Sequence, residues 1–213
     1  MRVTRWWWIR HAPVTEDGGC IYGQRDLPAD VSDTAAFKAL AGCLPREAFW
    51  VTSNLMRTHQ TAAAIVAAGP EIFQTAVEPA VEPDLAEQHF GEWQGRDRAE
   101  VYQQHGHRHG LWLAPAEVTP PGGESFVALT KRVSRAVERM TDENEGADIV
   151  AVAHGGTIRA ALGMALGTTP ERALAFSTDN LSLTRIDHVR APDVGGAWRV
   201  VATNLSPHGL GVS

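Results

Sequence analysis

Two apolar runs that each end directly in a histidine place the strongest constraint on the fold of this chain. Residues 3–9 are aromatic and aliphatic with one charged interruption, and Arg10 and His11 follow them. Residues 148–153 are almost continuously apolar, and His154 follows them with two glycines. Short apolar runs that end in polar residues are typical of buried strands. A cation and imidazoles at strand ends indicate an anion site at the edge of an α/β sheet.

The rest of the chain predicts further strands and helices of ordinary length. A helix rich in alanine should follow Ser53 and Asn54 and end at Gly69 and Pro70. Two strands, at 181–188 and 197–204, should form an antiparallel hairpin near the C-terminus. The other expected elements are helices at 33–43, 97–104, 124–141 and 157–166, with short strands at 49–52 and near Val81.

Composition bounds the class of protein. With 213 residues, of which 44% are hydrophobic and 21% charged, the chain suits a single domain over 1–213. A net charge of -6 argues against nucleic acid or an anionic membrane as a partner. No run approaches the roughly 18 apolar residues that span a bilayer, and no export signal is apparent. The two cysteines, Cys20 and Cys43, follow no motif, so we expect a reducing, cytoplasmic location.

Candidate anion-binding groups gather near the two histidines. Arg57 should fall in the first turn of the helix after 53–54, where the backbone N–H groups and the helix dipole favour an anion. Gly155 and Gly156 should let the backbone approach a ligand closely. By itself, Arg57 is more readily interpreted as an ordinary surface residue.

Glu87 is the candidate proton donor. It stands in a turn rich in glycine and aromatic residues, and Phe90 and Trp93 could remove water from it, which favours the neutral form of a carboxylic acid. A solvated loop glutamate is the plainer interpretation. Glu124 ranks second and Asp17 third as donors, although Glu124 could equally serve the start of the helix at 124–141.

A metal site is not expected. His105, His107 and His109 alternate in the segment HGHRH, but the spacing matches no zinc pattern. We therefore predict no metal and no cofactor, and expect activity to survive a chelator.

Five motifs in order resemble the histidine phosphatase superfamily, also called the phosphoglycerate mutase-like family. They are Arg10-His11, SNLMRTHQTA at 53–62, LAEQHFGEW at 85–93, PPGGES at 120–125 and VAHGGTIR at 152–159. The resemblance implies an α/β fold whose mostly parallel central sheet has helices on both faces. It also implies that His11 is the phosphorylated nucleophile, that Glu87 is the proton donor, and that Arg10, Arg57, His154 and Gly155 surround the phosphate, with His154 taking part in catalysis.

The chain departs from the family pattern beside the first histidine. Ala12 and Pro13 follow His11 where the family usually has glycine, and Asp17 and Gly18 stand where an asparagine is common. An acidic side chain facing the pocket would repel phosphate, so no phosphate-binding role is carried onto Asp17.

Three functions are compatible with these residues. The motifs look closest to the α-ribazole phosphatase branch of cobalamin biosynthesis, which implies hydrolysis of a small phosphorylated metabolite such as α-ribazole 5'-phosphate. A phosphoglycerate mutase-type transfer and a non-catalytic phosphate-binding module are the alternatives, and a homodimer is left open. The first candidate cover of the pocket, 12–30, is mostly acidic, and the second, 105–123, carries Trp112, Leu113, Ala114 and three prolines. These covers favour a neutral, nucleoside-like leaving group. Arg108 and the three histidines of the second cover could serve an anion if they point inward.

Overall fold

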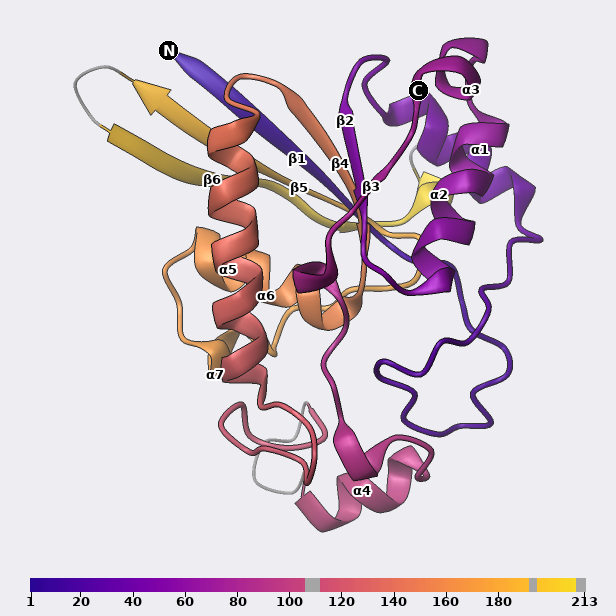
Figure 1. Cartoon of the computed structure of the whole chain (residues 1–213), viewed down its shortest axis with the longest axis vertical. Coiled ribbons are helices and arrows are strands. Elements are labelled where there is room, and N and C mark those ends of the chain that lie inside the picture. The colour runs from indigo at the N-terminus through magenta and orange to yellow at the C-terminus, as the bar shows by residue number, and fades with distance from the viewer. Residues whose placement is uncertain (106–111, 192–194, 210–213) are drawn as a thin grey trace.

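The first histidine-bearing strand lies inside a six-stranded sheet (Figure 1). The computed structural model describes residues 1–105, 112–191 and 195–209, with the backbone alone for 74–76. The strands are β1 (Arg2–Arg10), β2 (Phe49–Thr52), β3 (Ala80–Val81), β4 (Asp148–Ala153), β5 (Leu183–Ala191) and β6 (Gly195–Leu205), in the sheet order β3-β2-β4-β1-β5-β6.

The sheet is parallel from β3 to β1 and antiparallel from β1 to β6. β1 and β4 are parallel neighbours, and Arg10 pairs with Ala153 in their register. The residues that follow the two strands, His11 and His154, therefore emerge side by side at the same edge of the sheet. The mixed sheet and the C-terminal hairpin of β5 and β6 confirm the predicted fold class.

Helices cover both faces of this sheet (Figure 1). Side chains of a strand alternate between faces, and in β4 Ile149 and Ala151 pack with one group of helices while Val150 and Val152 pack with the other. One group comprises α1 (Thr34–Cys43), α2 (Met56–Ala68) and α3 (Glu71–Ala76), and the other α5 (Phe126–Glu143), α6 (Gly155–Ala165) and α7 (Pro170–Ala173). The remaining helical elements are α4 (Arg98–His105) and the 3-10 turns Pro83–Leu85, Gly91–Trp93 and Pro207–Gly209.

Local signals explain most boundaries, and two short helices were not predicted. Asp33 and Ser125 cap α1 and α5 by accepting hydrogen bonds from the backbone N–H groups three residues later. α6 begins at Gly155, two residues earlier than expected, so its N-terminus directly follows His154. The unpredicted helices are α3 and α7, which are only 6 and 4 residues long and follow or begin at a proline.

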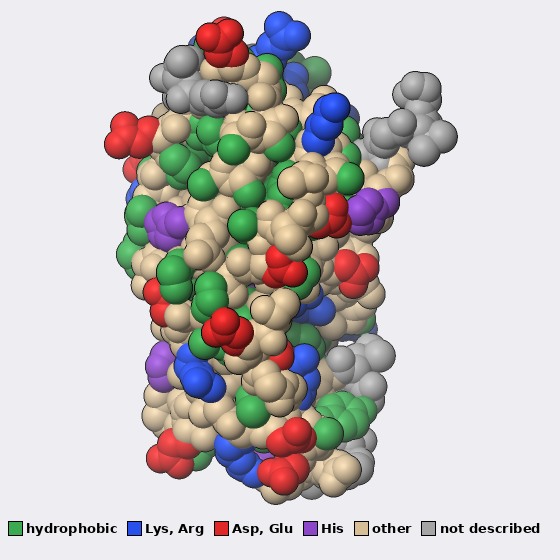
Figure 2. Space-filling model, turned by 90° about the vertical axis from the view of Figure 1, so that its right-hand side faces the viewer, with side chains coloured by type: hydrophobic (Ala, Val, Ile, Leu, Met, Phe, Trp, Pro, Cys, Tyr) green, Lys and Arg blue, Asp and Glu red, His purple; other side chains and the backbone are tan. Residues whose placement is uncertain are grey.

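The charge on the surface is mixed. Figure 2 shows acidic and basic side chains interspersed over the face that it draws, without a basic patch there. Among the described residues, no helix has both the length and the apolar character needed to cross a membrane.

Candidate active site

His11 is fully enclosed at the end of β1, with 1% of its surface exposed. Its Nδ1 lies 2.7 Å from the carbonyl oxygen of Ala12. A carbonyl can only accept, so Nδ1 carries the hydrogen and Nε2 keeps a free lone pair. Burial, followed by the charges of Arg57 and Arg10, holds the pKa of His11 well below its usual range. His11 is therefore neutral near pH 7, as a nucleophile must be.

His154 stands next to His11, with ring centroids 5.1 Å apart. Its Nε2 shares a 2.7 Å hydrogen bond with the hydroxyl of Ser53, which follows β2. Burial, and then the nearby charge of Arg57, lowers the pKa of His154 well below its usual range. Its Nδ1 is buried and has no partner among the described residues.

Two arginines, the buried Arg57 and the half-buried Arg10, complete the surroundings of His11. Arg10 donates from Nη1 to the carbonyl of Thr178 at 2.6 Å, and Arg57 donates to the carbonyls of Gly23 and Arg25 at 2.6 and 3.0 Å. These bonds fix both guanidinium groups, yet the Nε of each is buried without a partner in the described part of the chain. Buried donors that lack an acceptor are costly, and an anion beside His11 would supply one.

Glu87 reaches the same edge of the sheet from the turn after Pro83–Leu85. Its carboxylate accepts hydrogen bonds from the backbone N–H of Gly156, at 3.2 Å, and of Gln88, at 2.8 Å. A Cβ added to Gly156 would collide with Glu87 Oε1, so glycine is required there by the carboxylate. Beside it, a Cβ on Gly155 would lie 3.6 Å from Arg10 Nε, which places that backbone next to the phosphate-binding candidates.

The expected enclosure of Glu87 by aromatic side chains is wrong in part. Phe90 and Trp93 pack together in an apolar cluster with Ile21, Val101 and Leu113, and of the two only Phe90 borders the same cavity as Glu87. Backbone amides, rather than a tryptophan, therefore hold this carboxylate.

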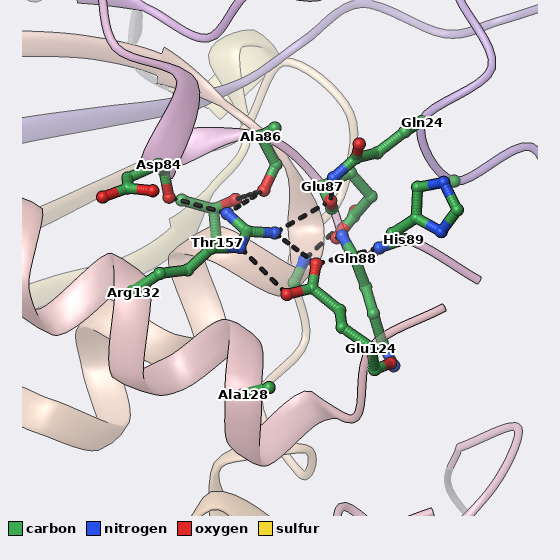
Figure 3. Close-up of polar contacts among 12 residues, drawn as sticks. Gln24, Asp84, Ala86, Glu87, Gln88, His89, Glu124, Ala128, Arg132 and Thr157 are labelled. Carbon is green, nitrogen blue, oxygen red and sulfur yellow. Dashed lines mark hydrogen bonds and ion pairs between the residues drawn. The ribbon is translucent and has the colours of Figure 1, made fainter. Parts of the chain in front are cut away.

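The segment that carries Glu87 is tied down by Arg132 of α5 (Figure 3). Arg132 donates to the carbonyls of Asp84, Ala86 and Glu87 at 2.7 to 3.0 Å. It also binds both oxygens of Glu124, at 2.6 and 3.0 Å. Glu124 is thus committed to Arg132 and to the backbone N–H of His89, which argues against the role of second proton donor that we considered for it.

Asp17 does not face the arginines of the site. Its carboxylate accepts from the backbone N–H of Gly19 and pairs with Arg98 at 3.4 Å. The departure from the family pattern at this position therefore adds no negative charge beside His11.

The alternating histidines fall mostly outside the described residues. His105 ends α4 and stacks on Trp93 with ring centroids 4.6 Å apart, while His107 and His109 are not described. Within the described residues, no group of three or more histidine, cysteine or acidic side chains is arranged to hold a metal ion.

A cavity of about 620 Å³ opens beside these residues. Arg10, Glu87 and Gly155 border it, and so does Tyr22, whose ring centroid lies 6.3 Å from that of His11. Its far walls come from α4 and from Trp112 and Leu113, with Arg159 of α6 between them and Gly155. The expectation of acidic and apolar walls did not include this arginine.

Sequence reasoning missed three residues of the site. The prediction that Ser53 caps the helix is wrong, because the N-cap of α2 is Leu55, and the Ser53 hydroxyl binds His154 instead; its place near Arg57 in SNLMRTHQTA was the available signal. Arg159 lies within the motif VAHGGTIR, but no role was assigned to it. Thr178 has no local motif, since it meets Arg10 across 168 residues of sequence.

Comparisons with known proteins identify the family. The model of the histidine phosphatase superfamily (branch 1) matches residues 6–204, so this chain belongs to the histidine phosphatase superfamily. A glucosyl-3-phosphoglycerate phosphatase from Mycolicibacterium vanbaalenii is 31% identical over 224 residues, which cover 97% of this chain and 96% of that protein. The solved structure of a mycobacterial glucosyl-3-phosphoglycerate phosphatase superposes with a TM-score of 0.79 at 26% identity, covering 96% of this chain and all of that one.

Other relatives are more distant or much longer. An adenosylcobalamin/α-ribazole phosphatase from Salmonella typhimurium is 25% identical over 158 residues, which cover 72% of this chain and 75% of that protein. A bifunctional protein from Mycobacterium tuberculosis is 37% identical over 131 residues, 60% of this chain. That match spans only about a third of the longer protein, 34%.

Proposed function

We propose that this chain is a phosphomonoesterase that works through a phosphohistidine on His11. One observation carries the proposal: a buried, neutral imidazole lies among buried nitrogens of Arg10, Arg57 and His154 that have no acceptor in the described structure. A phosphate monoester supplies both the electrophile for the imidazole and the oxygens for these nitrogens.

The first half of the reaction breaks the ester. Nε2 of His11 attacks phosphorus with its lone pair, and the bond from phosphorus to the ester oxygen breaks. The carboxylic acid form of Glu87 gives its proton to the departing oxygen. Arg10, Arg57 and His154 stabilise the charge on the non-bridging oxygens throughout.

The second half frees the enzyme. Water attacks phosphorus, Glu87 in its carboxylate form takes the proton of that water, and the bond between phosphorus and Nε2 breaks. Inorganic phosphate leaves, and both His11 and Glu87 return to their starting forms. The scheme needs no metal ion, because the two arginines carry the positive charge.

The substrate proposed at this level is a small phosphorylated metabolite. The activities of two relatives suggest two test compounds, glucosyl-3-phosphoglycerate and α-ribazole 5'-phosphate. A role in cobalamin biosynthesis would follow from the second compound. A cytoplasmic location is a separate proposal, which the free Cys20 and Cys43 support. A mutase is the alternative, since a relative from Gloeobacter violaceus is named as a phosphoglycerate mutase.

The test is to trap the covalent intermediate. The protein is mixed with each test compound, quenched in base because phosphohistidine is labile in acid, and mapped by mass spectrometry. We expect phosphate on His11, release of inorganic phosphate, and loss of both in His11→Ala. The matched control is His208→Ala, which removes an exposed histidine and should keep full activity.

Two results would overturn the proposal. The first is an active His11→Ala protein. The second is rapid interconversion of 2- and 3-phosphoglycerate with negligible release of phosphate, which would establish the mutase instead.

A further inference from the structure

Arg159 is a cation in the cavity that the proposed chemistry does not use. It stands on α6, one turn after Gly155, and lines the cavity. Its Nε donates to the carbonyl of Phe176 at 2.8 Å, and its guanidinium lies over the ring of Trp112, 4.5 Å from the centroid. These two contacts hold the plane of the guanidinium and leave its Nη groups to the cavity.

The charge of Arg159 is not neutralised by an ion pair within the described residues. Asp179 and Glu87 act on it from a distance, but Asp179 is bonded to Asn204 and Glu87 to backbone amides. Burial lowers the pKa of Arg159 to about 10, so the group is still charged at neutral pH. By contrast, the other arginine among the far walls, Arg98, pairs with Asp17.

The position of Arg159 separates it from the phosphate-binding groups. Arg57 and Arg10 are the arginines whose charges lower the pKa of His11. Arg57 and Arg159 both interact with the charges of Arg10 and Glu87, so the effect on His11 is what sets Arg57 apart from Arg159. Its Nη1 and the Nε of Arg10 lie on the same side of Gly155, 3.0 and 3.6 Å from where a Cβ would stand. Arg159 therefore lies beside Arg10 at the start of α6 and within the electrostatic reach of Glu87, whose carboxylic acid form protonates the leaving group.

We propose that Arg159, stacked on Trp112, binds a carboxylate on the leaving group of the substrate. The substrate class is then a phosphate monoester that carries a carboxylate close to the ester carbon, and this inference rests on the proposed phosphatase function. A planar guanidinium suits a carboxylate, which can accept two parallel hydrogen bonds. The single positive charge of Arg159 balances the single negative charge of a carboxylate. A second phosphate group, as a dianion, would require a second positive charge. This replaces our expectation of a neutral, nucleoside-like leaving group.

The experiment compares three probes on the whole protein. 3-Phosphoglycerate and glycerol 3-phosphate share a three-carbon frame and differ in the carboxylate, and p-nitrophenyl phosphate has no carboxylate. We expect the native protein to prefer 3-phosphoglycerate over glycerol 3-phosphate in kcat/KM by about tenfold or more, which corresponds to one good charged hydrogen-bonded contact. Arg159→Gln should reduce that preference to near unity, while turnover of p-nitrophenyl phosphate changes less than about threefold.

Two further variants make the comparison specific. Arg159→Lys keeps the positive charge but lacks the two parallel N–H donors of a guanidinium, so it should retain part of the preference for 3-phosphoglycerate. Arg185→Gln is the matched control, because Arg185 also lies over a tryptophan, Trp7 at 4.3 Å, on the distant strand β5. It should leave the preference unchanged.

The outcomes separate this inference from the proposed function. Equal losses on all three probes in Arg159→Gln would show that Arg159 binds the phosphate, and an absent preference in the native protein would also overturn the inference. If no probe releases phosphate, the proposed function is decided by the trapping experiment on its own test compounds. Calorimetric binding of 3-phosphoglycerate against glycerol 3-phosphate then still decides whether Arg159 recognises the carboxylate.

Discussion

At the scale of single residues, Glu87 differs from a solvated loop glutamate in how its carboxylate is held. Two backbone N–H groups orient both oxygens, and Gly156 allows the close approach. The side chain borders the cavity, where it can reach the ester oxygen of a substrate whose phosphate lies among Arg10, Arg57 and His154.

Glu87→Gln tests this role through the leaving group. An alkyl alkoxide needs a proton as it departs, whereas p-nitrophenolate does not, so we expect kcat/KM to fall about 10²–10⁴-fold for alkyl phosphates and far less for the aryl ester. Steady-state kinetics on both substrates measure the difference. Glu92→Gln, at an exposed neighbouring position, is the control, and equal losses on the two esters would make Glu87 structural.

At the scale of elements, two helices hold the segment that carries Glu87. Arg132 of α5 binds three carbonyl oxygens between Asp84 and Glu87. Thr157 of α6 donates to the carbonyls of Leu85 and Ala86. We therefore regard Arg132 as a positioning residue that acts through Glu87 (Figure 3).

Arg132→Met should misplace Glu87 and expose this role in the kinetics. We expect alkyl phosphates to lose at least about tenfold in kcat/KM and p-nitrophenyl phosphate much less, the same pattern as in Glu87→Gln. We also expect a loss of several kcal/mol of stability, because Glu124 is left without its partner in a half-buried site. Urea unfolding measures that loss.

The control for Arg132→Met lies on the same helix. Arg135 of α5 is exposed, so Arg135→Met removes an arginine of the same helix and leaves the bonds from Arg132 to the segment around Glu87 in place. Arg132 would have only a structural role if kcat/KM for the alkyl ester and for the aryl ester fell in the same ratio in both variants. Recovery of the alkyl ester rate in Arg132→Lys would strengthen the positioning role.

Elements could be predicted from the sequence, while most contacts between them could not. β1 and β4 carry strong apolar patterns, and the motifs at their ends predicted that His11 and His154 lie together. The motif SNLMRTHQTA after β2 added Arg57 to them. The bonds from Arg132 to the segment of Glu87 join residues about 45 positions apart, and they leave no periodic pattern in the sequence. Short helices such as α3 and α7 depend on packing rather than on propensity, which is why they were missed.

At the scale of the whole molecule, the two buried histidines couple folding to pH. Their pKa values lie well below 6.5 in the folded protein and near 6.5 in the unfolded chain. As pH falls below about 6.5, the unfolded chain therefore takes up protons that the folded protein does not. Stability should decrease through that window by up to about 1.4 kcal/mol per pH unit for each histidine.

Urea unfolding between pH 7.5 and 5, in a buffer without phosphate, measures this slope. His154→Gln should lose the share of the slope that belongs to His154, while His208→Gln, at an exposed position, should keep the native profile. An identical profile in the native protein and in His154→Gln would contradict a neutral, buried His154.

The unpartnered nitrogens of Arg10, Arg57 and His154 also make the product of the proposed reaction a ligand for folding. Any anion that satisfies them binds the folded chain and not the unfolded one, so phosphate at a hundredfold excess over its Kd would add about 2.7 kcal/mol of stability. Phosphate therefore lowers the catalytic rate while it raises the free energy of unfolding. The phosphate concentration that best protects the protein from heat is also the one that most strongly inhibits it.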